Sequence, residues 1–293
     1  MREITIKEAL GIPGAKIIDV RSEGEYEEAT IPGALNIPLL RNNERVVVGT
    51  TYRQKGVDEA RTLGFEFVSS RLPAMVRDYQ QLTDQGPLVV FCWRGGMRSK
   101  SVCSLLESVG IPVFRLVGGY KAYRRYVNEY LSRTLPHQTA VLHGLTGVGK
   151  TEVLNTLRSM GAPAIDLEQL ANNRGSVFGQ IGMGPQPTQK MFEGQLVQEL
   201  ALWEGTGYIV VECESRRIGR IILPENLTKA MESGTRILAH CPLEIRMERI
   251  KRIYNRDSDK FRESLKKAIL SLGQRIGKQR AAEFAAKVEQ GDL

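Results

Sequence analysis

Residues 140–151 read AVLHGLTGVGKT, and this stretch decides the fold of the second half of the chain. Its first residues form an apolar β-type run, its later ones match the G-x-x-x-x-G-K-T pattern, and helical periodicity follows. In a strand–loop–helix context, such glycines let successive backbone N–H groups face a phosphate, while the lysine reaches over the terminal phosphates. The pattern predicts a diphosphate-binding P-loop formed by Gly144, Thr146, Gly147, Gly149, Lys150 and Thr151.

Acidic residues follow two later strand-like runs and are candidates for completing this phosphate site. A hydrolysing P-loop enzyme normally presents an aspartate at the end of its Walker B strand. Here the run Ile209–Val211 is followed instead by Glu212 and Glu214, and Asp166 ends an earlier run. We therefore expect diphosphate binding rather than ATP hydrolysis. The candidate partners of a magnesium ion, none of them a firm metal ligand, are Thr151, Asp166, Glu212 and Glu214.

A second phosphate-type loop lies in the first half, where residues 92–99 read CWRGGMRS after the apolar run Leu88–Phe91. A thiol at the carboxyl end of a buried parallel strand lies where α/β proteins form their sites. Backbone N–H groups of the loop and the positive end of the following helix favour the reactive thiolate. We therefore expect Cys92 to act as a nucleophile, whereas Cys103, between apolar residues in mid-helix, is expected to be structural.

The other polar residues of this loop suit the binding of phosphate oxygens. Arg94 and Arg98 carry positive charge, and the two glycines permit the tight curvature that a ring of backbone N–H groups requires. The predicted catalytic residues of the chain are Cys92, Arg94, Arg98 and Lys150, and the predicted phosphate contacts in this loop are Gly95, Gly96 and Ser99.

The composition is that of a globular protein with a polyanionic partner. The 293 residues are enough for two domains, and the net charge is +8. No run approaches the roughly 20 apolar residues of a membrane span, and the N-terminus lacks a signal peptide, so we expect a cytoplasmic protein without a membrane partner. Four cysteines without a C-x-x-C pair and only three histidines argue against a disulfide framework and a zinc site.

Basic residues gather in three parts of the sequence, around residues 121–133, 216–220 and 246–267. Interspersed acidic residues make a solvated helix face an equally good interpretation of any one group. The three groups together, beside two phosphate loops, favour nucleic acid as the partner. An exposed tryptophan could stack on a base. The candidate RNA-binding residues are Trp93, Lys121, Arg124, Arg125, Arg216, Arg217, Arg220, Arg249 and Arg252.

Strand and helix patterns alternate in both halves, which predicts an α/β protein with two parallel-sheet domains. We expect a first domain at residues 1–131, a linker at 132–137, and a P-loop domain with a basic helical C-terminal region at 138–293. Residues 172–187 are predicted to be a long functional loop, because ordinary α/β connections are about 2–6 residues long. Other expected elements include helices at 57–63 and 68–82 and strands at 163–167 and 236–241.

Two motifs in the first half resemble those of rhodanese domains. Residues 17–26 read I-I-D-V-R-S-x-x-E-Y, residues 31–38 read I-P-G-A-x-N-I-P, and Cys92 falls where that family carries its catalytic cysteine. Thr30 departs from the family pattern, because many rhodaneses have a histidine there, but that histidine is not the nucleophile. The C-x5-R spacing from Cys92 to Arg98 is that of cysteine phosphatases and is one residue longer than single-sulfur carriers usually have. The wider ring favours a tetrahedral, phosphate-like donor.

The whole arrangement resembles the tRNA 2-selenouridine synthase family, in which a rhodanese domain is fused to a P-loop domain. The motifs that carry the resemblance are FCWRGGMRS at 91–99, VGGYK at 117–121, HGLTGVGKT at 143–151, Q-P-x-Q-K-x-F-E at 186–193 and E-x-E-S-R-x-I-G at 212–219. The resemblance implies that selenium replaces sulfur in wobble 2-thiouridine, with selenophosphate as donor and a geranylated intermediate made from geranyl diphosphate. It further implies the anticodon region of tRNA and a selenophosphate-supplying enzyme as partners, with Mg²⁺ beside the diphosphate.

Two other interpretations stay open on the residues alone. A cysteine phosphatase or sulfurtransferase fused to a small-molecule kinase fits the C-x5-R and Walker A loops, and the phosphatase form predicts phosphatase turnover without RNA. A non-catalytic, nucleotide-gated RNA-binding protein fits the basic residues and predicts that Cys92→Ser has no effect.

Overall fold

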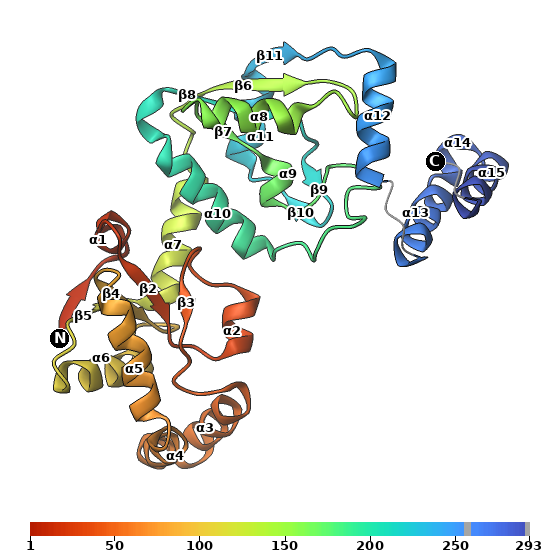
Figure 1. The fold of residues 1–293 in the computed structure, drawn as a ribbon. Helices are drawn as coiled ribbons and strands as arrows, with labels where there is room; N and C mark the ends of the chain where they lie inside the picture. Colours follow the sequence, from red (N-terminus) through yellow and green to blue (C-terminus); the bar gives the residue numbers. More distant parts are fainter. Residues whose placement is uncertain (255–258, 291–293) are drawn as a thin grey trace. The chain divides into compact units, whose positions relative to one another are not determined.

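The computed structural model describes residues 1–254 and 259–290 and contains two compact units, Met1–Tyr130 and Leu131–Leu293 (Figure 1). Each unit has its own parallel β-sheet. The predicted class, α/β with two parallel-sheet domains and a helical C-terminal region, is therefore confirmed.

The first unit is built on a five-stranded sheet in the order β1-β5-β4-β2-β3. All its pairings are parallel, and β4 is bonded to a neighbour on each edge. Every residue of β4 is buried, as expected for a strand covered by helices on both faces. The strands are β1 (Arg2–Ile4), β2 (Lys16–Asp19), β3 (Leu35–Asn36), β4 (Leu88–Phe91) and β5 (Val113–Leu116).

Seven helices accompany this sheet in the chain. They are α1 (Ile6–Gly11), α2 (Glu23–Glu28), α3 (Asn42–Lys55), α4 (Val57–Ser69), α5 (Leu72–Thr83), α6 (Met97–Ser108) and α7 (Gly119–Leu131). The helices expected at 57–63 and 68–82 are present, but α4 ends later than predicted, at Ser69, and α5 begins later, at Leu72. The reason is Pro73, which lacks an N–H and fits the first turn of α5 better than a helix interior. Helix α3 was not expected from the sequence, because it has no apolar stripe: its buried residue is Glu44.

The second unit is built on a four-stranded parallel sheet in the order β11-β6-β8-β7. Its strands are β6 (Gln138–His143), β7 (Ala164–Ile165), β8 (Tyr208–Glu212) and β11 (Thr235–Leu238), and a separate antiparallel pair is formed by β9 (Arg217–Ile218) and β10 (Ile221–Ile222). Leu142, Leu154 and Val210 belong to the core that joins the sheet to its helices. The accompanying helices are α8 (Lys150–Ser159), α9 (Leu167–Leu170), α10 (Gln189–Leu202), α11 (Glu225–Ser233) and α12 (Leu243–Tyr254).

Two strands of this unit are shorter than the sequence predicts. The run at 163–167 pairs only over β7, because Asp166 turns the chain into α9 and accepts a hydrogen bond from the Gln169 N–H at 2.7 Å. The run at 236–241 pairs over β11, one residue earlier and three residues shorter at its end. Residues 172–187, all of which the structure describes, contain no helix or strand, as expected.

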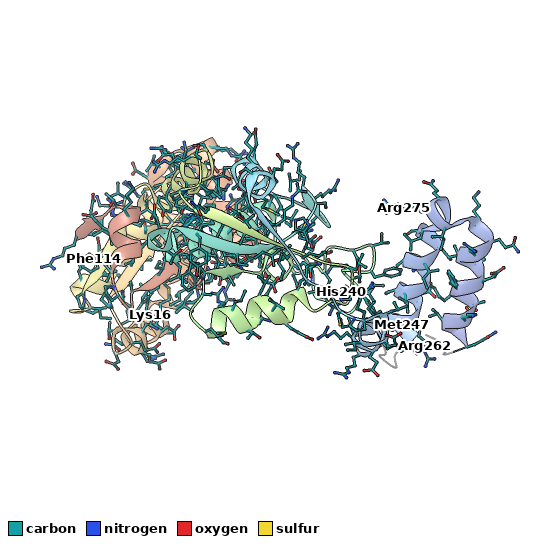
Figure 2. All side chains as sticks on the ribbon, turned by 90° about the horizontal axis from the view of Figure 1, so that it is seen from above. Lys16, Phe114, His240, Met247, Arg262 and Arg275 are labelled. Carbon is teal, nitrogen blue, oxygen red and sulfur yellow. The ribbon has the colours of Figure 1, made fainter. Side chains whose placement is uncertain are left out.

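The C-terminal region is helical, with α13 (Asp259–Ser271), α14 (Gly273–Ile276) and α15 (Lys278–Glu289). Phe261, Leu265 and Val288 of α13 and α15 pack with Ile181 from the long loop. Figure 2 shows Arg262 and Arg275 at opposite ends of this helical group. Over the part of the chain that the structure describes, every helix is too short or too polar to span a bilayer.

A buried ion pair next to β4 generates a prediction about the stability of the first unit. Arg21, 2% exposed, donates to the Asp19 carboxylate at 2.6 Å and to the Ala29 carbonyl at 2.7 Å. Asp19→Ala leaves this guanidinium buried without its counter-charge and is expected to cost about 3–5 kcal/mol of unfolding free energy. Hydrogen exchange of the β4 amides measures the loss.

The matched control is Asp58→Ala, which removes the exposed partner of Arg61. A surface pair of this kind is worth about 0–1 kcal/mol, so the control is expected to exchange like the unchanged protein. Equal exchange rates for the two variants would show that the Asp19–Arg21 pair does not hold the sheet together.

Candidate active site

Cys92 lies at the carboxyl end of β4 and is 3% exposed. Its Sγ is 3.2 Å from the Ser99 Oγ, and the Ser99 hydroxyl also lies 3.2 Å from the Gly96 carbonyl oxygen. Helix α6 begins at Met97, so the thiol faces the first turn of a helix whose N–H groups carry partial positive charge. The structure therefore brings together the predicted nucleophile, the predicted phosphate-binding serine and a helix N-terminus.

A glycine pair after β5 closes the other side of this loop. The Tyr120 and Lys121 N–H groups donate to the Cys92 and Trp93 carbonyls, each at 2.9 Å. Gly119 has a φ of 56°, and a Cβ at this position would lie 2.1 Å from the Cys92 carbonyl oxygen. Only glycine fits at position 119. The segment 117–121 can therefore pack closely against the loop that carries Cys92.

The two predicted phosphate-holding arginines have different surroundings. Arg94 is exposed, whereas Arg98 donates to the Glu25 carboxylate at 2.6 and 3.2 Å. Burial alone would raise the pKa of Glu25, but the hydrogen bonds from Arg98 bring it below its ordinary value. Arg98 is thus held at the start of α6 by an ion pair, and its contact with a phosphate stays a prediction.

Two arginines that sequence reasoning missed contact the cysteine loop and the residues packed against it. The Arg115 guanidinium donates to the Gly95 carbonyl and pairs with Glu3. The Arg21 guanidinium lies 4.3 Å from the Tyr120 ring centre and 5.8 Å from that of Trp93. Arg21 belongs to the quoted rhodanese motif, and its place in that motif was the available signal, whereas nothing in the sequence marked Arg115.

Thr30 and Cys103 both have structural roles near the cysteine loop. The Thr30 hydroxyl donates to the Asp19 carboxylate at 2.8 Å, so it serves the buried ion pair rather than the thiol. Cys103 is fully buried in α6, and burial raises the pKa of its thiol to about 12. The structural role expected for Cys103 is confirmed.

In the second unit, the P-loop joins β6 to α8. Gly147 and Gly149 have φ values of 81° and 95°, which only glycine adopts readily, and these turns shape the loop around a phosphate position. The Lys150 ammonium lies 3.4 Å from the Gly144 carbonyl oxygen, curled over the loop. Thr151 follows at the start of α8. The predicted ligands are therefore brought together in the expected strand–loop–helix arrangement.

Helix α12 braces this loop through its arginines. The Arg246 guanidinium donates to the Thr146 carbonyl at 3.0 Å, and Arg249 donates to the Val148 carbonyl at 2.9 Å. Arg249 also pairs with Glu152 at 3.0 Å. Arg249 thus supports the P-loop, a role that sequence reasoning, which assigned it to RNA, did not foresee.

The other predicted RNA-binding residues lie mainly on exposed positions. Arg220 donates to the Gln186 and Pro187 carbonyls of the long loop, and Arg217 donates to the Gly219 carbonyl at 2.9 Å. Arg124 donates to Asn128 along α7. The remaining candidates, which are exposed, are Trp93, Lys121, Arg125, Arg216 and Arg252.

Four carboxyl groups gather where β7 and β8 end, beside Lys150. Asp166 and Glu212 are 7% and 2% exposed, and the Glu212 Oε1 accepts from the Glu168 N–H at 2.7 Å. Burial and the nearby Glu214 charge together raise the pKa of Glu168 to about 8, although the Lys150 ammonium lowers it. Burial likewise raises the pKa values of Asp166, Glu212 and Glu214. Glu168 is the member that sequence reasoning missed, although it follows Asp166 at the same strand end.

These carboxyls bear on the predicted magnesium ion. Raised pKa values favour protonated carboxyls, which are poor cation ligands. Within residues 1–254 and 259–290, no three histidine, cysteine, aspartate or glutamate side chains are arranged to hold a metal. The residues therefore do not fit a protein-only metal centre. Magnesium usually binds through substrate phosphates and one or two carboxylates, so its entry with a diphosphate stays a prediction.

Comparison with known proteins covers both units. Residues 5–126 match the model of the rhodanese-like domain, and residues 137–291 match that of the tRNA 2-selenouridine synthase AAA domain. The tRNA 2-selenouridine synthase of Hydrogenovibrio crunogenus is 39% identical over 82% of this chain and 68% of its own length.

Two further proteins named tRNA 2-selenouridine synthase are also similar to most of this chain. That of Psychromonas ingrahamii is 32% identical over 85% of this chain and 68% of its own length. That of Bdellovibrio bacteriovorus is 34% identical over 94% of this chain and 80% of its own length. The cysteine loop lies within the part of the chain that matches the rhodanese-like domain, the P-loop lies within the part that matches the synthase AAA domain, and the chain belongs to the tRNA 2-selenouridine synthase family.

Proposed function

We propose that this protein is a tRNA-modifying transferase that replaces sulfur with selenium in wobble 2-thiouridine. The donor is selenophosphate, and a geranylated thiouridine made from geranyl diphosphate is the intermediate. The observation that carries the proposal is the presence of a buried thiol loop and a P-loop in one chain of the tRNA 2-selenouridine synthase family. Each loop suits a phosphorus-containing co-substrate, one a single phosphoryl group and the other a diphosphate.

In the first half-reaction, the thiouridine sulfur attacks the first carbon of the geranyl chain. A carbon–sulfur bond forms, the bond from that carbon to the diphosphate oxygen breaks, and diphosphate leaves with the electron pair. Lys150 and the N–H groups of the P-loop stabilise the charge that develops on the leaving group. Because the pKa of Glu168 is raised to about 8, this carboxyl adds little negative charge next to the departing diphosphate.

In the second half-reaction, the selenium of selenophosphate attacks carbon 2 of the base, and the bond from that carbon to sulfur breaks so that the geranyl thiolate leaves. Water then attacks the phosphorus, the Se–P bond breaks, and phosphate is released. Cys92 acts in one of two ways. It attacks carbon 2 first and expels the geranyl thiolate, so that selenium then displaces the cysteine, or it attacks the phosphorus of selenophosphate, so that an S–P bond that water later hydrolyses forms and selenide leaves to attack carbon 2. Arg94 at the open side of the loop is the group that can reach the phosphate oxygens, since Arg98 is paired with Glu25. A selenophosphate-supplying enzyme is the corresponding partner, and the exposed basic residues bind the tRNA anticodon region.

The role of the cysteine loop is tested by Cys92→Ser. The variant is expected to form no selenouridine while tRNA binding is retained, because the thiolate is lost but the basic surface is not. Nucleoside mass spectrometry and a tRNA-binding assay measure the two effects. Cys103→Ser, which replaces a buried thiol of helix α6 in the same way, serves as the control and is expected to retain activity. Normal selenium incorporation by Cys92→Ser would contradict the catalytic role.

The role of the P-loop is tested by Lys150→Ala. This variant is expected to lose geranylation by at least tenfold, because the leaving diphosphate loses its nearest cation. Supplied with pre-geranylated tRNA and selenophosphate, it is expected to retain selenation, whereas Cys92→Ser is expected to accumulate the geranylated nucleoside. Intact geranylation in Lys150→Ala, or an absolute requirement for ATP, would favour the kinase interpretation instead.

The contribution of α7 to RNA binding is tested by replacing Arg124 and Arg125 with alanine. Loss of two phosphate contacts is expected to reduce the slope of log affinity against log salt by up to about two units. Replacement of Arg53 and Lys55, two basic residues at the end of α3, is the control and is expected to leave the slope unchanged. An unaltered slope in the α7 variant would exclude this helix from the interface.

A further inference from the structure

An apolar cavity lies beside the P-loop in the second unit. Its volume is about 450 Å³, within the range of about 300–1,000 Å³ that is typical of small-molecule sites. Its walls come from α12, the long loop and the C-terminal helices (Figure 2, where Met247 marks α12 and Arg262 marks α13). The lining residues used below are Phe178, Ile250, Tyr254, Leu265, Ile269 and Phe284.

We infer that this cavity binds the hydrocarbon chain of a prenyl diphosphate whose diphosphate group lies on the P-loop. The inference rests on the proposed function and adds to it a location and a set of residues for the chain of the substrate. Apart from Phe178 in the predicted functional loop, these residues belong to the basic helical region of the sequence, where no role had been expected for them.

The connection between cavity and P-loop runs along one face of α12. Arg246, Ile250 and Tyr254 are spaced four residues apart, so they line the same side of the helix. Arg246 bonds to the P-loop carbonyl of Thr146, and a Cβ on Gly147 would lie 3.1 Å from the Ile250 Cδ1. Ile250 and Tyr254 both line the cavity. Ile250 therefore lies close to Gly147 of the P-loop and also lines the apolar cavity.

The chemistry of the lining favours a hydrocarbon over a nucleobase. A base requires hydrogen-bonding groups placed around its edge, whereas Leu265, Ile269 and Phe284 offer only apolar surface. Phe178 and Tyr254 add aromatic rings whose centres are 6.1 Å apart. Lys251 and Lys287 also line the cavity and are exposed, so they can meet the anionic end of the ligand or the RNA without entering the apolar part.

The long loop gives the cavity its fourth wall. Phe178 comes from residues 172–187, the segment predicted to be a long functional loop, and Ile181 of the same segment packs against Phe261 and Leu265. The Arg174 guanidinium lies 6.0 Å from the Tyr254 ring centre, which links the loop to α12. The same loop thus contacts the carboxylate cluster at Gly175 and the cavity at Phe178.

The experiment compares the binding of geranyl diphosphate and inorganic diphosphate to the full chain by titration calorimetry. The unchanged protein is expected to bind geranyl diphosphate at least tenfold more tightly, because the chain leaves water. Phe284→Asp is expected to lower the affinity for geranyl diphosphate by at least tenfold without altering the affinity for inorganic diphosphate. Leu270→Asp is the matched control, since Leu270 and Phe284 are 51% and 47% exposed on the C-terminal helices but only Phe284 lines the cavity.

A second variant, Ile269→Trp, fills the cavity without adding charge. Its affinity for geranyl diphosphate is expected to fall by at least tenfold, and its affinity for the shorter dimethylallyl diphosphate by less. This variant decides the question if Phe284→Asp misfolds and therefore binds neither geranyl diphosphate nor inorganic diphosphate. If both cavity variants bind geranyl diphosphate normally while Lys150→Ala does not, the cavity assignment is wrong and the P-loop assignment stands. If the unchanged protein prefers a nucleoside triphosphate and does not bind geranyl diphosphate, the proposed function and the cavity assignment both fail.

Discussion

The cysteine loop and the P-loop both depend on a parallel β-sheet in which the inner strands are hydrogen-bonded to a parallel neighbour on each edge. In such a sheet the carboxyl ends of neighbouring strands meet at one edge, so residues far apart in the sequence converge there. In the first unit, β2, β4 and β5 deliver Arg21, Cys92 and Gly119 to one place. In the second, β6, β7 and β8 deliver the P-loop, Asp166 and Glu212.

What surrounds each loop then determines its chemistry. The cysteine loop is held by backbone contacts from the glycine pair and by ion pairs at Asp19 and Glu25, which fix the position of the loop that carries the thiol. The P-loop is braced by α12, and the Glu168 carboxyl, whose pKa is raised to about 8, lies near Lys150. A raised pKa of this carboxyl suits a reaction that releases a diphosphate, because it reduces the negative charge that the departing anion meets.

The features that local patterns encode could be predicted from the sequence, and those that depend on distant packing could not. Cys92 directly follows an apolar run, and the P-loop that leads to Lys150 lies between an apolar run and a helical pattern, so the positions of both loops at strand ends were predictable. The pairing of Arg98 with Glu25 joins residues 73 positions apart, and the bond from Arg249 to Val148 joins residues 101 apart. No periodicity reports such contacts, which is why an arginine that braces the P-loop was assigned to RNA.

The measurement that tests the central claim most directly is mass spectrometry of tRNA nucleosides from cells in which this chain is the sole selenouridine synthase. The account predicts that wobble 2-selenouridine forms when selenophosphate is present, and that the geranylated nucleoside appears when selenophosphate is withheld. Unmodified 2-thiouridine under both conditions, in cells that contain the folded protein, would contradict the account.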